Sequence, residues 1–135
     1  MDRPDPNYWR TKPHAPAPGT PLAPLGSIPD GEGKEFVFGD PKGGFRMFVV
    51  RQGDAVHGYV NVCPHFSLPL NYRPDEFMNS DGTLIMCTMH FALFRIEDGF
   101  CVDGSCVGHY LDPVPLAVGR DGMVSIGSGG SAASP

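Results

Sequence analysis

The chain has 135 residues, enough for one domain with a buried core and too few for a second, catalytic domain beside it. Its 18 glycines and 15 prolines, with no long apolar repeat at the helical period, predict an all-β fold of antiparallel strands joined by turns. The net charge of -5, without a cluster of basic residues, argues against nucleic acid and against a membrane as partners.

The first residues show no targeting signal. Met1 is followed by Asp-Arg-Pro-Asp-Pro, without an apolar segment, a twin arginine or a run long enough to span a bilayer. We therefore expect a cytoplasmic protein. Because that compartment is reducing, the four cysteines indicate a metal site more than disulfides.

Residues 1–24 contain seven prolines and are expected to form an extended N-terminal arm. Two large aromatic residues, Tyr8 and Trp9, lie within it. They either pack against the chain's own domain or dock a partner or a neighbouring subunit. The first interpretation is favoured, because aromatic side chains in such arms usually find apolar surface on their own domain.

Strands are predicted where β-branched and aromatic residues stand between turn residues, at 35–38, 45–51, 56–62, 83–86, 91–96, 114–118 and 123–126. In the strand at 56–62, side chains alternate between two faces, with three valines on one face and His57, Tyr59 and Asn61 on the other. The simplest expectation for His57 is that it faces solvent. The Gly/Ser-rich tail at 127–135 is expected to be flexible.

Two short motifs combine cysteine with histidine. Cys63-Pro64-His65 and Cys87-Thr88-Met89-His90 each follow or end a strand-like run, and a spacer of 21 residues separates them. Each motif offers one thiolate and one imidazole, so two facing loops can hold two metals. Thiolate stabilises ferric iron and bridging sulfide, whereas neutral imidazole is a weaker donor that lets one iron accept an electron more readily. Mixed ligation therefore predicts a redox cluster.

The alternative is a structural zinc site, since two cysteines and two histidines also satisfy tetrahedral zinc. Zinc fingers usually pair Cys with Cys and His with His along the chain. The interleaved order here argues against zinc.

The paired motif resembles that of the Rieske iron-sulfur family, C-x-H and C-x-x-H around a spacer of about this length, and the resemblance runs from about residue 26 to residue 126. It implies one [2Fe–2S] cluster per chain, with Cys63 and Cys87 on the inner iron and His65 and His90 on the outer iron. It also implies a Rieske domain over residues 25–126, in which a small cluster-binding subdomain at about 63–95 sits on a larger β base.

The chain departs from high-potential members of that family. Ala92 and Phe94 stand where those members place a Ser and a Tyr that donate hydrogen bonds to cluster sulfurs, and Leu68 and Met89 stand where they carry a disulfide. The missing donors imply a low potential, and both departures imply the soluble ferredoxin branch. Gly104-Ser105 stands where many members of the family carry a Gly-Pro loop that forms a wall of the cluster.

Two further cysteines, Cys101 and Cys106, lack a complete ligand set near them. They are expected to be partly buried thiols, with a disulfide between them as the alternative.

The resemblance implies a one-electron carrier, not an enzyme, that passes electrons from a flavin-dependent reductase to a terminal oxygenase acting on aromatic rings or related substrates. A terminal oxygenase itself is not expected, because no second domain is present to hold a mononuclear iron. Two alternatives stay open: the Rieske-like small subunit of an assimilatory nitrite reductase, and a redox-sensing interaction module. Four intact ligands argue against a nitrite reductase subunit that has lost its cluster.

Overall fold

The structure, a computed structural model, describes residues 8–39, 44–62, 70, 77–79, 82–87, 92–104 and 107–127. Within these residues the chain forms ten strands and two short 3-10 helices, η1 (Tyr8–Thr11) and η2 (Leu25–Ser27), and all strand pairs are antiparallel. The prediction of an all-β fold is confirmed.

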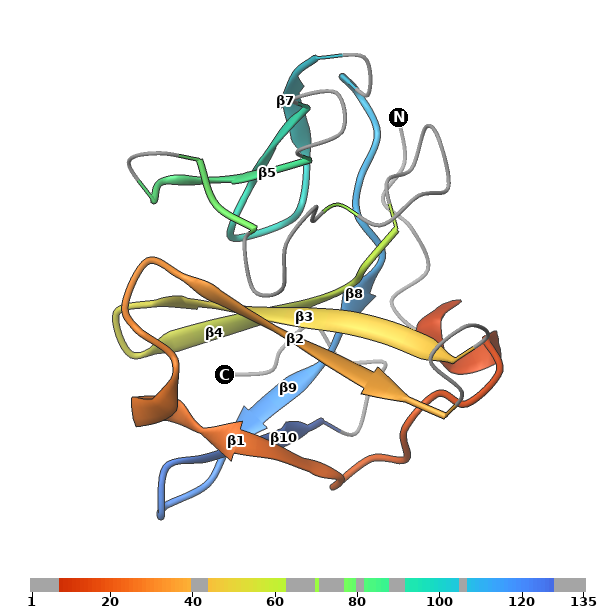
Figure 1. The fold of residues 1–135 in the computed structure, drawn as a ribbon, viewed down its shortest axis with the longest axis vertical. Coiled ribbons are helices and arrows are strands. Elements are labelled where there is room, and N and C mark those ends of the chain that lie inside the picture. Colours follow the sequence, from red (N-terminus) through yellow and green to blue (C-terminus); the bar gives the residue numbers. More distant parts are fainter. Residues whose placement is uncertain are drawn as a thin grey trace.

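The strands make three sheets, which lie one above another in Figure 1. The terminal sheet has the order β1 (Pro21–Pro24), β10 (Met123–Ile126), β9 (Leu116–Val118). The central sheet has the order β2 (Gly33–Phe38), β3 (Phe45–Gln52), β4 (Ala55–Val60), β8 (Pro113–Val114). The small sheet has the order β5 (Leu84–Met86), β6 (Leu93–Arg95), β7 (Cys101–Asp103).

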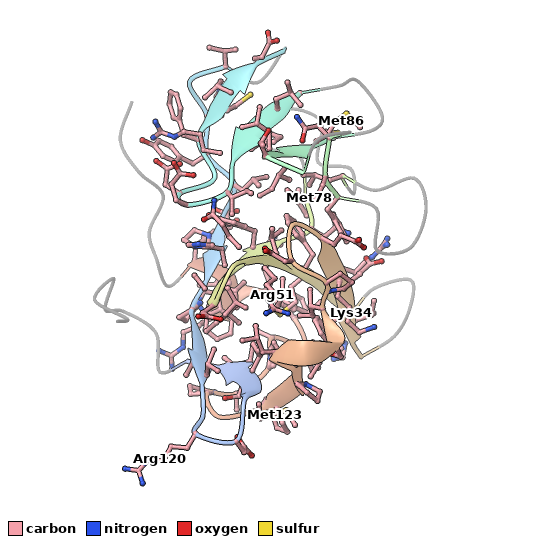
Figure 2. The ribbon with its side chains drawn as sticks, turned by 90° about the vertical axis from the view of Figure 1, so that its left-hand side faces the viewer. Lys34, Arg51, Met78, Met86, Arg120 and Met123 are labelled. Atoms are coloured by element: carbon pink, nitrogen blue, oxygen red, sulfur yellow. The ribbon has the colours of Figure 1, made fainter. Side chains whose placement is uncertain are left out.

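The side view in Figure 2 shows the same order along the long axis of the molecule. Met78 and Met86 lie at the end with the small sheet, Lys34 and Arg51 lie at the level of the central sheet, and Met123 and Arg120 lie at the end with the terminal sheet. The central sheet is therefore the middle layer.

Strand β3 is buried on both faces, because the central sheet has a core on each side. The base core, on the side of the terminal sheet, contains Trp9, Ile28, Phe45, Met47, Val49, Val60, Val114 and Ile126. The bridging core joins the central sheet to the small sheet and contains Phe48, Val50, Tyr59, Leu70, Phe77, Ile85, Cys87, Ala92, Phe94, Ile96, Cys101 and Leu111. Alternation along one strand thus supplies both cores.

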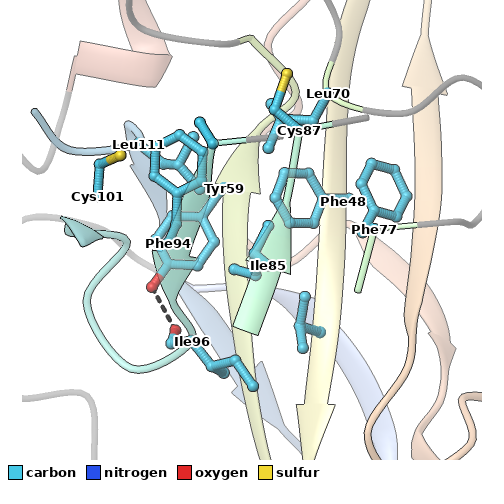
Figure 3. Packing of buried hydrophobic residues seen from close by; sticks show 12 residues of the cluster. Phe48, Tyr59, Leu70, Phe77, Ile85, Cys87, Phe94, Ile96, Cys101 and Leu111 are labelled. Carbon is cyan, nitrogen blue, oxygen red and sulfur yellow. Dashed lines mark hydrogen bonds between the residues drawn. The ribbon is translucent and has the colours of Figure 1, made fainter. Parts of the chain in front are cut away.

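The expectation that His57 faces solvent is wrong, because His57 is half-buried and its face of the strand is covered. Tyr59 and Asn61 are 3% and 1% exposed, and His57 is half-buried. The Tyr59 hydroxyl donates a hydrogen bond to the Ile96 carbonyl at 2.6 Å (Figure 3). The small sheet covers this face, and a two-residue period identifies two faces without showing what covers each.

The single strand predicted at 114–118 is divided between two sheets. β8 pairs with β4 in the central sheet, and β9 pairs with β10 in the terminal sheet. Pro115, between them, has no N–H to continue a ladder, and its carbonyl accepts the Gly127 N–H at 2.8 Å. The proline is where the chain passes from one sheet to the next.

The described part of the N-terminal segment packs on the domain. Trp9 is fully buried and meets the Phe45 ring edge-on, with centroids 6.3 Å apart, as the first of the two interpretations predicts for it. Tyr8 remains 46% exposed. Further along, the Gly19 N–H donates to the Ile126 carbonyl and β1 pairs with β10, so residues 19–24 extend the terminal sheet.

No helix in the described residues is long and apolar enough to cross a membrane.

Candidate metal centre

Of the four predicted ligands, the structure describes Cys87, whereas Cys63, His65 and His90 lie outside the described residues. The residues that flank both ligand loops are described. Val62 and Leu70 bound the first loop, and Cys87 and Ala92 bound the second. The described part of the site therefore consists of the residues at the ends of its two loops.

The second predicted ligand loop connects β5 with β6, which pair antiparallel. Met86 and Leu93 are the last strand pair, and the Cys87 N–H then donates to the Ala92 carbonyl at 2.9 Å. Residues 88–91 connect these two residues. Because the hydrogen bond closes the base of this connection, the backbone of Cys87 has a fixed position at the end of β5.

The first loop is closed by a side chain. Asn61 is buried, and its Oδ1 accepts a hydrogen bond from the Leu70 backbone N–H at 2.8 Å. This bond spans the segment that carries Cys63 and His65. Leu70 itself is fully buried in the bridging core.

The ends of the two loops meet in the bridging core. Leu70 and Cys87 both belong to it, and Figure 3 draws them side by side at one end of the cluster of side chains. Phe77 stacks on Phe48 with ring centroids 4.3 Å apart, and the Phe77 carbonyl accepts the Met86 N–H at 2.7 Å. The central sheet thus supports β5 and the cysteine at its end.

A third segment lies against the second loop. Gly104 has a φ of +95°, and a Cβ placed on it would lie 2.7 Å from the Ala92 Cα. Only glycine fits such an approach without displacing a neighbour. The described part of the loop therefore does reach the second ligand loop, although Ser105 and Cys106 lie outside the described residues.

Ala92 and Phe94 are fully buried in the bridging core. Neither side chain carries a hydroxyl, so neither can donate the hydrogen bonds that their counterparts provide in high-potential members of the family.

Cys101, at the start of β7, is fully buried, and its Sγ donates a hydrogen bond to the Asp103 carbonyl at 3.2 Å. Since Cys106 is outside the described residues, the choice between two thiols and a disulfide stays a prediction.

Two titratable groups near the core have shifted pKa values. Burial lowers the pKa of His57, partly opposed by the negative charge of Glu97. Burial raises the pKa of Asp112, partly opposed by the positive charge of Lys12.

At Cys87, the one predicted ligand that the structure describes, the surroundings fit a [2Fe–2S] cluster. Cys87 is 0% exposed, and a thiolate at such a depth is stable when it binds a cation. A sulfur-ligated inner iron needs this kind of position. Among the described residues no three His, Cys, Asp or Glu side chains gather into a possible metal site, and the other three predicted ligands are not among them.

Sequence reasoning missed Asn61 as a residue of this site. It placed Asn61 only by alternation, on the same face as His57, whereas the structure shows that its side chain is buried and hydrogen-bonded through both amide atoms. The available signal was its position two residues before Cys63, where an amide can bond to the backbone of the loop that follows.

A family model described as the Rieske [2Fe-2S] domain matches residues 20–116 of the chain. No curated protein matches the chain.

Several solved structures share the fold. The ferredoxin of carbazole 1,9a-dioxygenase from Nocardioides aromaticivorans IC177 is 22% identical with a TM-score of 0.59, over 81% of this chain and 98% of that chain. The terminal oxygenase of carbazole 1,9a-dioxygenase from Novosphingobium sp. KA1 is 19% identical with a TM-score of 0.65, over 82% of this chain and 30% of that chain. The reduced complex between oxygenase and ferredoxin in carbazole 1,9a-dioxygenase contains a chain that is 22% identical with a TM-score of 0.67.

The match in that complex covers 85% of this chain and 29% of that chain. The chain thus spans nearly all of one similar ferredoxin and about a third of the longer proteins. At these identities the likeness shows the fold.

Proposed function

Because the chain belongs to the Rieske [2Fe–2S] domain family, we propose that it is a one-electron carrier whose cluster is held by Cys63, His65, Cys87 and His90. The observation that supports this assignment best is the position of Cys87. It is fully buried at the end of β5, and it shares the bridging core with Leu70, the residue that ends the other predicted ligand loop.

When bound, the cluster supplies one-electron oxidation and reduction at its histidine-ligated iron. The protein's own residues do the rest. The bridging core excludes water from the side of Cys87, and the closure bonds at Asn61 and Cys87 hold the two loops at their bases. The imidazole edges of His65 and His90 are the proposed route for the electron, within the cluster-binding part at residues 63–95.

The proposed partners are a flavin-dependent reductase and a terminal oxygenase. Support comes from the full-length match to a ferredoxin that belongs to a dioxygenase system. The acidic charge of -5 fits protein partners in the cytoplasm better than nucleic acid or an anionic membrane. Aromatic rings or related molecules would be the substrates of the oxygenase, not of this chain.

The proposed potential lies at the low end of the Rieske range. Hydrogen bonds to cluster sulfurs favour the extra negative charge of the reduced state, and Ala92 and Phe94 supply none. The bridging core around them is apolar, which also disfavours added charge.

Metal and sulfide analysis of the purified protein tests the cluster directly. We expect iron and acid-labile sulfide in equal amounts and a reddish-brown colour. Zinc without sulfide in aerobically handled protein would contradict the proposal. Protein-film voltammetry should then give a negative midpoint potential near neutral pH, and a strongly positive one would show that the argument from Ala92 and Phe94 is wrong.

A further inference from the structure

The buried side chain of Asn61 connects three parts of the chain. Its Nδ2 donates to Glu35 Oε2 on β2 at 2.8 Å, and its Oδ1 accepts the Leu70 N–H at 2.8 Å. Its own backbone N–H donates to the Arg46 carbonyl on β3 at 2.9 Å. The residue is 1% exposed, so water does not replace these partners easily.

The partners fix which way the amide points. A carboxylate oxygen can only accept from Asn61, and a backbone N–H can only donate to it. A flipped amide would face oxygen to oxygen at Glu35 and N–H to N–H at Leu70. Only one orientation of the amide therefore satisfies both contacts. Because Glu35 binds Nδ2, the amide oxygen Oδ1 must point toward the Leu70 N–H.

Glu35 is itself held in place. Its Oε2 also accepts from Arg46 Nε at 2.8 Å, and Arg46 Nη2 lies 2.6 Å from the same oxygen. The Glu35 side chain is 12% exposed and that of Arg46 is 37% exposed, so the pair is shielded on the side of the carboxylate. β2 and β3 are joined by a six-pair ladder, which gives both side chains a rigid base.

We propose that Asn61, oriented by Glu35 and Arg46, is a positioning residue that sets the geometry of the first ligand loop and so the stability of the cluster. The inference rests on the proposed function, because it takes Cys63 and His65 as ligands. It adds a chain of contacts that runs from the middle of the central sheet to the end of that loop.

The connection matters because it closes the first loop close to its predicted ligands. Cys63 follows Asn61 by two residues, and the Leu70 N–H returns to the same side chain nine residues along the chain. Residues that orient metal ligands from behind typically change metal affinity by about 10- to 100-fold when mutated. We expect an effect of that order on the rate of cluster loss.

The main test compares Asn61→Ala with Asn79→Ala in the cluster-loaded protein. Asn79 is a matched control because its Oδ1 also accepts two backbone N–H groups, those of Thr83 and Leu84, in a loop without predicted ligands. Loss of visible absorbance in excess chelator gives the rate of cluster loss. We expect Asn61→Ala to lose its cluster about 10- to 100-fold faster than wild type, and Asn79→Ala to lose it at a rate close to that of wild type.

A second readout does not depend on the cluster spectrum. Hydrogen exchange with mass spectrometry reports protection in the peptide that contains residues 63–70. We expect Asn61→Ala to lose protection there, because the Leu70 N–H loses its acceptor, while the peptides of β3 and β4 keep theirs.

Variants of Glu35 test the orientation step, and they carry the test if Asn61→Ala does not fold. Glu35→Ala removes the acceptor and should resemble Asn61→Ala. Glu35→Gln keeps an oxygen that can accept from Asn61 and should lie between Glu35→Ala and wild type. If the Glu35 variants and Asn61→Ala all lose the cluster no faster than Asn79→Ala, the positioning role is wrong. Absence of iron and sulfide from wild type would instead overturn the proposed function.

Discussion

The central sheet and the small sheet differ in how much of their order comes from their own strands. β3 has eight residues and forms full ladders with β2 and β4, which have six each. The strands of the small sheet have three residues each, and a register shift interrupts the pairing of β6 with β7. Short strands of this kind are marginal on their own.

The small sheet gains its stability from contacts outside its ladders. The bridging core packs it on β3 and β4, Tyr59 bonds to Ile96, and the hydrogen bond from Cys87 to Ala92 closes its hairpin. A bound cluster adds metal–ligand bonds to the same end, and such bonds contribute to folding free energy. From this difference we expect the base to keep its order without the metal and the cluster end to become less ordered without it.

The largest effect should come from the sulfur ligand. Cys87→Ala removes a ligand of the cluster, so we expect no iron, no sulfide and no visible spectrum, together with lost hydrogen-exchange protection in the small sheet. The central sheet should keep its protection.

The matched control is Cys101→Ala, a second fully buried cysteine of the same core. It should lose roughly 0.5–3 kcal/mol of unfolding free energy and keep the cluster spectrum. Loss of the spectrum in this variant, or a normal spectrum in Cys87→Ala, would reverse the ligand assignment.

The next largest effect should come from substitutions in the two cores, which distinguish the cluster end from the base. Phe77→Ala removes a fully buried ring that stacks on Phe48, and the loss of unfolding free energy should be about 3–5 kcal/mol. Phe45→Ala, in the base core, should cost a similar amount because Phe45 is 2% exposed. Denaturant titration measures both losses. Only Phe77→Ala should also speed cluster loss in chelator, and equal rates for the two variants would remove the distinction between the cores.

Two glycines near the cluster end form a matched pair for substitution by alanine. Gly104 and Gly108 have φ values of +95° and +93°, so an alanine is strained at either position, by about 1–3 kcal/mol. A Cβ at Gly104 would press on Ala92, whereas a Cβ at Gly108 would meet nothing within 4 Å. We expect Gly104→Ala to change the midpoint potential and the visible circular dichroism, and Gly108→Ala to leave both unchanged. Identical spectra would mean that the loop of Gly104 does not shape the cluster's surroundings.

The smallest effect concerns pH. Burial lowers the pKa of His57 in the folded state, so the unfolded chain binds more protons just below its own pKa of about 6.5. The free energy of unfolding should therefore fall as the pH falls from about 6.5 through the lowered pKa. Urea titrations at a series of pH values should show a shallower dependence for His57→Gln. An unchanged slope would mean that His57 does not contribute to it.

The sequence predicted the base better than the cluster end. Strands at 45–51 and 123–126 were placed within one residue of β3 and β10, because long β-branched and aromatic runs between turns carry a local signal. The alternation of Val56, Val60 and Val62 correctly put them on one face, and all three belong to or pack on the base core.

The features that were missed depend on contacts between distant segments. β7 was not predicted as a strand, since its three residues are too few to show an alternating pattern and its pairing with β6 is interrupted by a register shift. The burial of Tyr59 and Asn61 needs the small sheet above them, and the strand at 114–118 is split because its halves join different sheets. The candidate ligands could be predicted from the two sequence motifs, whereas the proposed role of Asn61 could be inferred only from its contacts in the folded chain.

Pulsed electron paramagnetic resonance of the reduced protein, grown with ¹⁵N-labelled histidine, tests the central claim most directly. We expect a lower average g value than that of an all-cysteine cluster and nitrogen couplings from two histidines, which His65→Ala and His90→Ala should each disturb. A reduced cluster without histidine nitrogen couplings would contradict mixed ligation by these four residues.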